Sequence, residues 1–140
     1  MTAKEFLKQY EYAVRRIRMI EEELDQETAL IDAIRSASDN DGMPHGSGIS
    51  KPTEDKAVRL ADKKLRLINA RLDAVAKRQD VFDLISSIDG IEGEVLFHRY
   101  VNLRKWEEIC ILVHYSWQGV HKVHKRALGI VESRLKCTNI

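Results

Sequence analysis

The stretch Ser116–Arg126 holds the side chains of this sequence that are best suited to binding phosphate. It carries three basic residues and two histidines, and it has no acidic residue. A basic stripe of this kind is the electrostatic footprint expected for contact with a nucleic-acid backbone. A solvated helix face can have the same composition, so charge alone leaves both interpretations open. The basic residues are Lys122, Lys125 and Arg126, and the histidines are His121 and His124.

We also consider whether the same region could bind zinc or carry a catalytic nucleophile. His121 and His124 stand three residues apart, with Cys110 and His114 before them, but zinc ligands usually occur in tighter pairs on turns. Cys110 falls on a helix that should be packed, which indicates a small buried hydrophobe rather than a nucleophile. We therefore expect no metal, no cofactor and no enzymatic activity.

Length and composition limit the classes of protein to which this chain can belong. The chain has 140 residues, with 23 Lys and Arg against 22 Asp and Glu, only two Pro, and seven Gly. This profile is typical of a helix-rich globular or coiled protein. No apolar run approaches the roughly 20 residues that span a bilayer, the N-terminus has no apolar signal core, and the two cysteines form no disulfide framework. We expect a cytoplasmic protein that does not bind membranes.

Two long segments must support the basic stretch. Their apolar residues alternate at spacings of three and four, which is typical of a coiled-coil seam. The first segment, residues 2–38, has the seam Phe6, Tyr10, Ala13, Ile17, Ile20, Leu24, Glu27, Ile31 and Ile34. The second begins near Thr53, a potential N-cap, and has the seam Val58, Ala61, Leu65, Ile68, Leu72, Val75, Gln79 and Phe82. The Gly-rich and Pro-containing residues 39–52 between them predict a loop.

Two such segments joined by one loop predict an antiparallel helical hairpin. Leu60 and Leu67 fall off the predicted seam, and we interpret them as further apolar surface that packs against a second copy of the chain. The polar seam residues Glu27 and Gln79 can fix the register of the pairing.

The residues after Gly90 follow a different pattern. Residues 92–101 and 105–113 predict two short helices, separated by a turn over 102–104. His114 and Tyr115 predict a second tight turn, and Ser116 is well placed as the N-cap of a helix over 117–136. A short helix, a brief turn and a capped basic helix form the layout of a helix-turn-helix.

The same residues carry a family likeness. Gly93–Tyr100 resembles the E-x-V-L-x-x-R-[YF] helix in region four of bacterial sigma factors, and Lys105–Ile109 is similar to their T-[LW]-E-E-I helix. Ser116–Val123 stands where their recognition helix has S-x-x-x-V-x-x-[IV], and Ala127-Leu128 matches the A-L pair that follows. The matches run in register without a gap from Lys105 to Val131.

The layout of the whole chain resembles small phage and prophage regulators of the ArpU/RinA-like group, which control late genes. There are departures from the sigma pattern. Trp117, Gly119 and His121 replace the Arg-rich pattern common in sigma recognition helices, so promoter-type readout does not carry over. The chain also has no room for the regions with which a full sigma factor binds the −10 element or core polymerase.

The resemblance implies a division of roles among the residues of the last three helices. Four residues are expected to face the bases of the major groove: Trp117, Gln118, His121 and Lys122. Five correspond to positions that touch phosphates: Arg99, Lys105, Ser116, Lys125 and Arg126. Two of these assignments have open alternatives, because Trp117 can pack on a protein partner and Arg99 can form a structural ion pair with Glu107 or Glu108.

We therefore expect an all-α fold with two domains. Residues 1–88 form a helical hairpin that oligomerises, with its loop at 39–52, and residues 89–140 form a helix-turn-helix similar to sigma region four. The expected function is sequence-specific binding of double-stranded DNA by a phage-encoded transcriptional regulator, as a dimer or tetramer, with RNA polymerase as a further candidate partner. The alternatives are a small terminase-like packaging protein and a coiled-coil scaffold whose helix-turn-helix binds protein.

Overall fold

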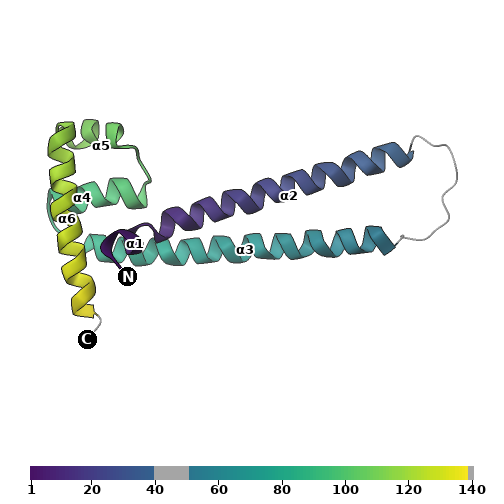
Figure 1. The fold of residues 1–140 in the computed structure, drawn as a ribbon, viewed down its shortest axis with the longest axis horizontal. Helices are drawn as coiled ribbons and strands as arrows, with labels where there is room; N and C mark the ends of the chain where they lie inside the picture. The colour runs from purple at the N-terminus through teal and green to yellow at the C-terminus, as the bar shows by residue number, and fades with distance from the viewer. Residues whose placement is uncertain (40–50, 139–140) are drawn as a thin grey trace. The chain divides into compact units, whose positions relative to one another are not determined.

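The computed structural model describes residues 1–39 and 51–138, and every regular element in these two ranges is a helix (Figure 1). The elements are α1 (Ala3–Leu7), α2 (Gln9–Asp39), α3 (Lys51–Ser86), α4 (Ile91–Leu96), the single π-helical turn η1 (Phe97–Val101), α5 (Trp106–Val113) and α6 (Trp117–Thr138). The predicted all-α class is confirmed. Most of the predicted loop 39–52 lies outside the described residues, and α3 begins at Lys51, so Thr53 is inside the helix and the predicted cap there is wrong.

Contacts divide the chain into two units. One consists of Met1–Val14 together with Asp73–Ile140, and the other of Arg15–Leu72. The sequence suggested a boundary at residue 88 instead. The contacts divide differently because α1 and the last turns of α3 pack with the C-terminal helices.

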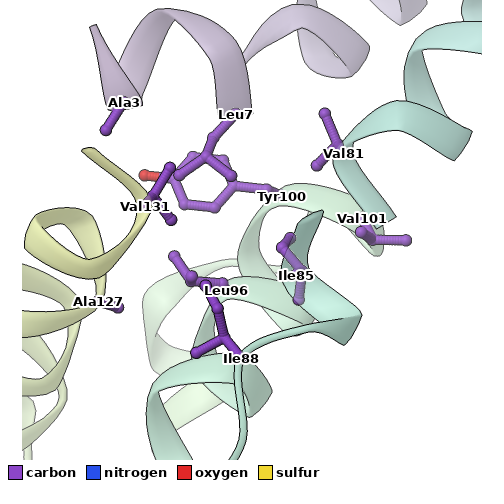
Figure 2. Packing of buried hydrophobic residues seen from close by; sticks show 10 residues of the cluster. All are labelled: Ala3, Leu7, Val81, Ile85, Ile88, Leu96, Tyr100, Val101, Ala127 and Val131. Atoms are coloured by element: carbon purple, nitrogen blue, oxygen red, sulfur yellow. The ribbon is translucent and has the colours of Figure 1, made fainter. Parts of the chain in front are cut away.

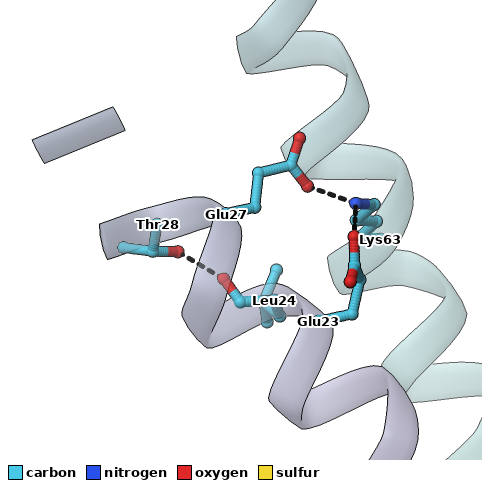
Figure 3. Close-up of polar contacts among 5 residues, drawn as sticks. All are labelled: Glu23, Leu24, Glu27, Thr28 and Lys63. Atoms are coloured by element: carbon cyan, nitrogen blue, oxygen red, sulfur yellow. Dashed lines mark hydrogen bonds and ion pairs between the residues drawn. The ribbon is translucent and has the colours of Figure 1, made fainter. Parts of the chain in front are cut away.

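Within the unit Arg15–Leu72, α2 and α3 run antiparallel. Lys63 Nζ lies 2.9 Å from Glu23 Oε1 and also pairs with Glu27 (Figure 3). Arg71 Nη2 lies 2.9 Å from Glu21 Oε1. The partner's number on α3 falls as the number on α2 rises, which is the pattern of an antiparallel pair. Hydrogen bonds to Glu27 and Glu23 raise the pKa of Lys63.

The α2 side of this pair follows the predicted seam. Ile17, Ile20, Leu24, Glu27 and Ile31 are all partly buried, whereas most of their charged neighbours are exposed. Only the last residue of the predicted seam, Ile34, is exposed.

The predicted seam of α3 is wrong. Its large apolar residues in this unit are 52–65% exposed, and these are Val58, Leu65, Ile68 and Leu72. The row that turns inward instead consists of Leu60, Lys63, Leu67 and Ala70, and Leu67 is only 7% exposed. Leu60 and Leu67 therefore pack inside the chain rather than against a second copy. Both rows have the same spacing of three and four, but only the inner one supplies a cation for Glu27.

The unit formed by Met1–Val14 and Asp73–Ile140 has one main core. Figure 2 shows ten buried side chains from the two ends of the sequence packed together: Ala3, Leu7, Val81, Ile85, Ile88, Leu96, Tyr100, Val101, Ala127 and Val131. The short α1 can form because Thr2 and Glu5 make a capping box, in which Glu5 N donates to Thr2 Oγ1 at 3.2 Å and Thr2 N donates to Glu5 Oε2 at 2.9 Å. A second cluster joins α4, α5 and α6 through Val95, Ile109, Val113, Val120 and Val123.

The C-terminal elements lie close to their predicted bounds. The expected helix over 92–101 is α4 followed by η1, in which Asn102 N donates to Phe97 O at 3.1 Å. The helices expected over 105–113 and 117–136 are α5 and α6. None of the helices described here is long and apolar enough to cross a bilayer.

Two glycines allow the chain to turn from α3 into α4. Gly90 has a φ of +86°, which L side chains rarely adopt. At Gly93 the constraint is space, because an added Cβ would lie 2.1 Å from the carbonyl oxygen of Ile88. The backbone of α4 therefore lies directly against the end of the preceding segment, and only glycine permits this approach.

We expect Gly93→Ala to destabilise the protein by about 1–3 kcal/mol, because the new methyl group must displace backbone rather than a flexible side chain. Gly129→Ala is the matched control, since an added Cβ there meets nothing within 4 Å and alanine favours a helix by about 1 kcal/mol over glycine. Chemical denaturation followed by circular dichroism measures both effects. Equal stability of the two variants would contradict the close approach at Gly93.

Candidate nucleic-acid interface

The start of α6 is fixed by local geometry. Ser116 Oγ accepts a hydrogen bond from Gly119 N at 3.1 Å, so the predicted N-cap is confirmed. His114 ends α5 in a left-handed conformation with a φ of 58°. Gly119 leaves room for this cap, because an added Cβ would lie 3.1 Å from Ser116 Oγ.

One face of α6 carries the residues predicted to read bases. The opposite face is buried through Val120, Val123 and Ala127, which leaves the charged and polar side outside. A single shallow depression is lined by Trp117, Gln118, His121, Lys122 and Lys125. The structure thus brings together all four predicted base-contacting residues and one of the predicted phosphate contacts.

Aromatic and imidazole rings gather at this depression, and two of them, Trp117 and His121, belong to its lining. Five of them form what we call the ring cluster: Tyr100, Trp106, Trp117, His121 and His124. The ring of His121 lies between two indoles, with centroid distances of 4.8 Å to Trp106 and 4.6 Å to Trp117. The positions of His121 and Trp117 are therefore set partly by Trp106, a residue of α5 that was not among the predicted site residues.

The most buried part of the ring cluster contains a hydrogen bond between Tyr100 and His124. The Tyr100 hydroxyl and His124 Nε2 lie 2.7 Å apart and share a hydrogen bond. Burial raises the pKa of Tyr100 to about 12. Burial, followed by the positive charges of Lys4, His121, Arg99 and Lys8, lowers the pKa of His124 to about 4. His124 is therefore neutral at pH 7 and adds no charge to the basic stretch.

Two other predicted phosphate contacts, Arg99 and Lys105, lie outside the depression. Arg99 is partly buried, its Nη1 donates to the carbonyl oxygen of Arg104 at 2.9 Å, and its Cζ lies 4.8 Å from the centroid of Trp106. These contacts hold the turn before α5 in place and give Arg99 a structural role, with partners other than the predicted Glu107 or Glu108. Lys105 is exposed immediately before α5.

Arg126 has an acidic neighbour that the sequence pattern did not reveal. Its Nε lies 3.4 Å from Glu92 Oε1, and the Arg126 side chain is 61% exposed. Glu92 is only 22% exposed, whereas the guanidinium of Arg126 reaches solvent and can exchange Glu92 for a phosphate oxygen.

Of the candidate metal ligands, Cys110, His121 and His124 are partly buried, whereas His114 is exposed. Cys110 is partly buried and packs against the second core cluster, as expected for a small hydrophobe. Over residues 1–39 and 51–138, no group of three or more His, Cys, Asp or Glu side chains is placed to hold a metal ion.

No protein-family model matches this chain, and no curated protein or solved structure is significantly similar to it.

The buried imidazole of His124 makes an acid-dependent prediction. The folded-state pKa of about 4 lies below the ordinary value of 6.5, so this side chain favours the folded state above pH 6.5, and its contribution is lost as the pH falls toward 4. We expect His124→Gln to reduce the loss of stability between pH 7 and pH 4 by on the order of 1–2 kcal/mol, after allowance for solvent screening. His114→Asn, at an exposed position whose left-handed backbone asparagine tolerates, is the control. Denaturation curves at several pH values test this, and parallel pH profiles for wild type and His124→Gln would contradict it.

Proposed function

We propose that this chain binds double-stranded DNA through the exposed face of α6 and regulates transcription, as a small regulator with a helix-turn-helix similar to sigma region four. The observation that carries the proposal is the shared depression lined by Trp117, Gln118, His121, Lys122 and Lys125. These residues recur at one-turn intervals from the first residue of a capped helix, which is where recognition helices present side chains to the major groove.

The side chains of this face offer complementary chemistry to base edges. Gln118 has an amide that can pair with adenine through two hydrogen bonds, and the Lys122 ammonium can donate to guanine O6 and N7. Both are exposed and lie one helical turn apart. Trp117 is 51% exposed and can contact a thymine methyl group or the sugar edge.

Trp106, a member of the ring cluster outside the reading face, supports two side chains of that face. Trp106 lies against His121, and His121 in turn lies against Trp117, so packing restricts the rotamers of two presented side chains before DNA arrives. Preorganisation of this kind lowers the entropy cost of binding. Phosphate contacts from Lys105, Lys125 and Arg126 would set the position of the helix on the duplex.

The proposal includes a homo-oligomer, because helix-turn-helix proteins bind repeated half-sites as equivalent copies. RNA polymerase is a further candidate partner, and control of phage late genes is the context that the family likeness suggests. Assembly into a ring of eight or more copies would favour the packaging alternative instead.

A duplex selected from the source genome allows the roles of single residues to be measured. Gln118→Ala and Lys122→Ala should each cost about 1–3 kcal/mol on the selected site and relax base preference there. Arg126→Ala should weaken matched and scrambled duplexes alike and reduce the log–log salt slope by about 0.9, the value for one phosphate contact. Arg59→Ala, an exposed basic residue of α3, controls for the loss of a positive charge elsewhere.

Fluorescence anisotropy at two salt concentrations separates the outcomes. Equal losses of affinity by Gln118→Ala and Lys122→Ala on both duplexes would mean that α6 does not read bases. A wild-type protein with no affinity for any duplex at low salt would overturn the proposed function and favour a protein-binding scaffold.

A further inference from the structure

An apolar row on α3 is left uncovered in the unit Arg15–Leu72. Four large side chains of this row are 52–65% exposed, and with Ala61 between them they form what we call the outer stripe: Val58, Ala61, Leu65, Ile68 and Leu72. The row that packs on α2, which includes Lys63 and Leu67, lies on nearly the opposite side of the helix by the geometry of 3.6 residues per turn. Each of these four side chains keeps more than half of its surface exposed.

The spacing of the outer stripe distinguishes it from scattered surface hydrophobes. Its members follow one another at intervals of three, four, three and four, which is the heptad period that keeps one face of a helix against a partner helix. Single exposed apolar residues are ordinary on protein surfaces, whereas a repeated row marks an interaction surface. In the sequence the same period continues through Val75 and Phe82, which are also exposed.

Charges on the two flanks of the outer stripe define the orientation of a partner helix. One flank carries Lys64 and Arg71, of which Arg71 also pairs with Glu21 of α2, and the other flank carries Asp55, Asp62 and Asn69. An antiparallel copy would place basic flank against basic flank and acidic against acidic, which is unfavourable. A parallel copy instead places Lys64 beside Asn69 and Arg71 beside Ala76 of the next helix, which avoids this repulsion. Farther along the repeat, Arg78 and Asp83 occupy the positions that pair between parallel helices.

We propose that the outer stripe is a self-association surface at which copies of this chain pair through α3, in parallel and in register. The heptad places Leu65 and Leu72 at the first core position and Ile68 at the second, a combination that favours four strands over two. The proposal names the surface and geometry of the homo-oligomer that the proposed function includes, but it rests on the exposed row and its flanking charges rather than on DNA binding. An anionic membrane is a poor match for the same face, since one of its flanks is acidic.

The solution mass of matched variants tests the surface. We expect wild-type protein at tens of micromolar to be a tetramer by light scattering, and Leu65→Glu combined with Ile68→Glu to be a monomer with its helical circular dichroism retained. Leu30→Glu is the matched control, because Leu30 lies on α2 in the same unit, is 62% exposed and is outside the stripe. The control should keep the wild-type mass.

Cysteine cross-linking tests the orientation. In a full-length background with Cys110→Ala and Cys137→Ser, Val58→Cys should form an intermolecular disulfide, because parallel, in-register helices bring equivalent core positions together. In an antiparallel pair Val58 would lie near the far end of its partner. An assembled protein that forms no such disulfide would overturn the parallel orientation.

Other oligomeric states of the wild type and the variants also test the outer stripe as a self-association surface. A monomeric wild-type protein, or an oligomer that survives Leu65→Glu with Ile68→Glu, would overturn the outer stripe as a self-association surface. A dimer broken by those two substitutions would support the surface and overturn the four-strand assignment. DNA binding measured on the same samples keeps the two proposals apart, since a monomeric variant should still bind a single half-site with reduced avidity.

Discussion

The pairing of Lys63 with Glu27 decides which face of α3 turns inward. Glu27 is a member of the α2 seam and its side chain is only 17% exposed. A shielded carboxylate without a cation is unfavourable, and the inner row of α3 supplies Lys63 as that cation. The more apolar row of α3, from Val58 to Leu72, has no basic residue that could pair with Glu27, so this row faces away from α2. One ion pair thereby determines both the packing of the long helices and the surface left for other molecules.

In the unit formed by Met1–Val14 and Asp73–Ile140, the main core is formed by N-terminal and C-terminal segments that pack together. Leu7 and Val81 are fully buried beside Val131 of α6. The helix that carries the candidate interface is therefore anchored by residues distant in the sequence, from α1 at the N-terminus and from the last turns of α3. Ring contacts restrict the side chains on the exposed face of α6, and aliphatic packing fixes its buried face. A core substitution far from the depression can therefore shift the side chains that line the depression.

The sequence predicts best what is set locally. The bounds of α6 and the Ser116 cap follow from nearby apolar spacing and one hydroxyl, and the five side chains of the depression follow from their positions on one helix. The inward face of α3 could not be predicted, because two rows have the same period and the choice depends on a carboxylate on another helix. The ring cluster was equally hidden, since Tyr100, Trp106 and His124 come from three elements.

The π-helical turn η1 has a consequence for how related sequences should be aligned. Because Asn102 N donates to the oxygen of Phe97, five residues earlier, this turn holds one residue more than an α-helical turn. Loss of a single residue here would restore a regular helix but rotate one side of it by about 100° relative to the other. Tyr100 would then move away from His124. A homologue with a one-residue gap between Phe97 and Val101 should therefore also differ at the position of His124.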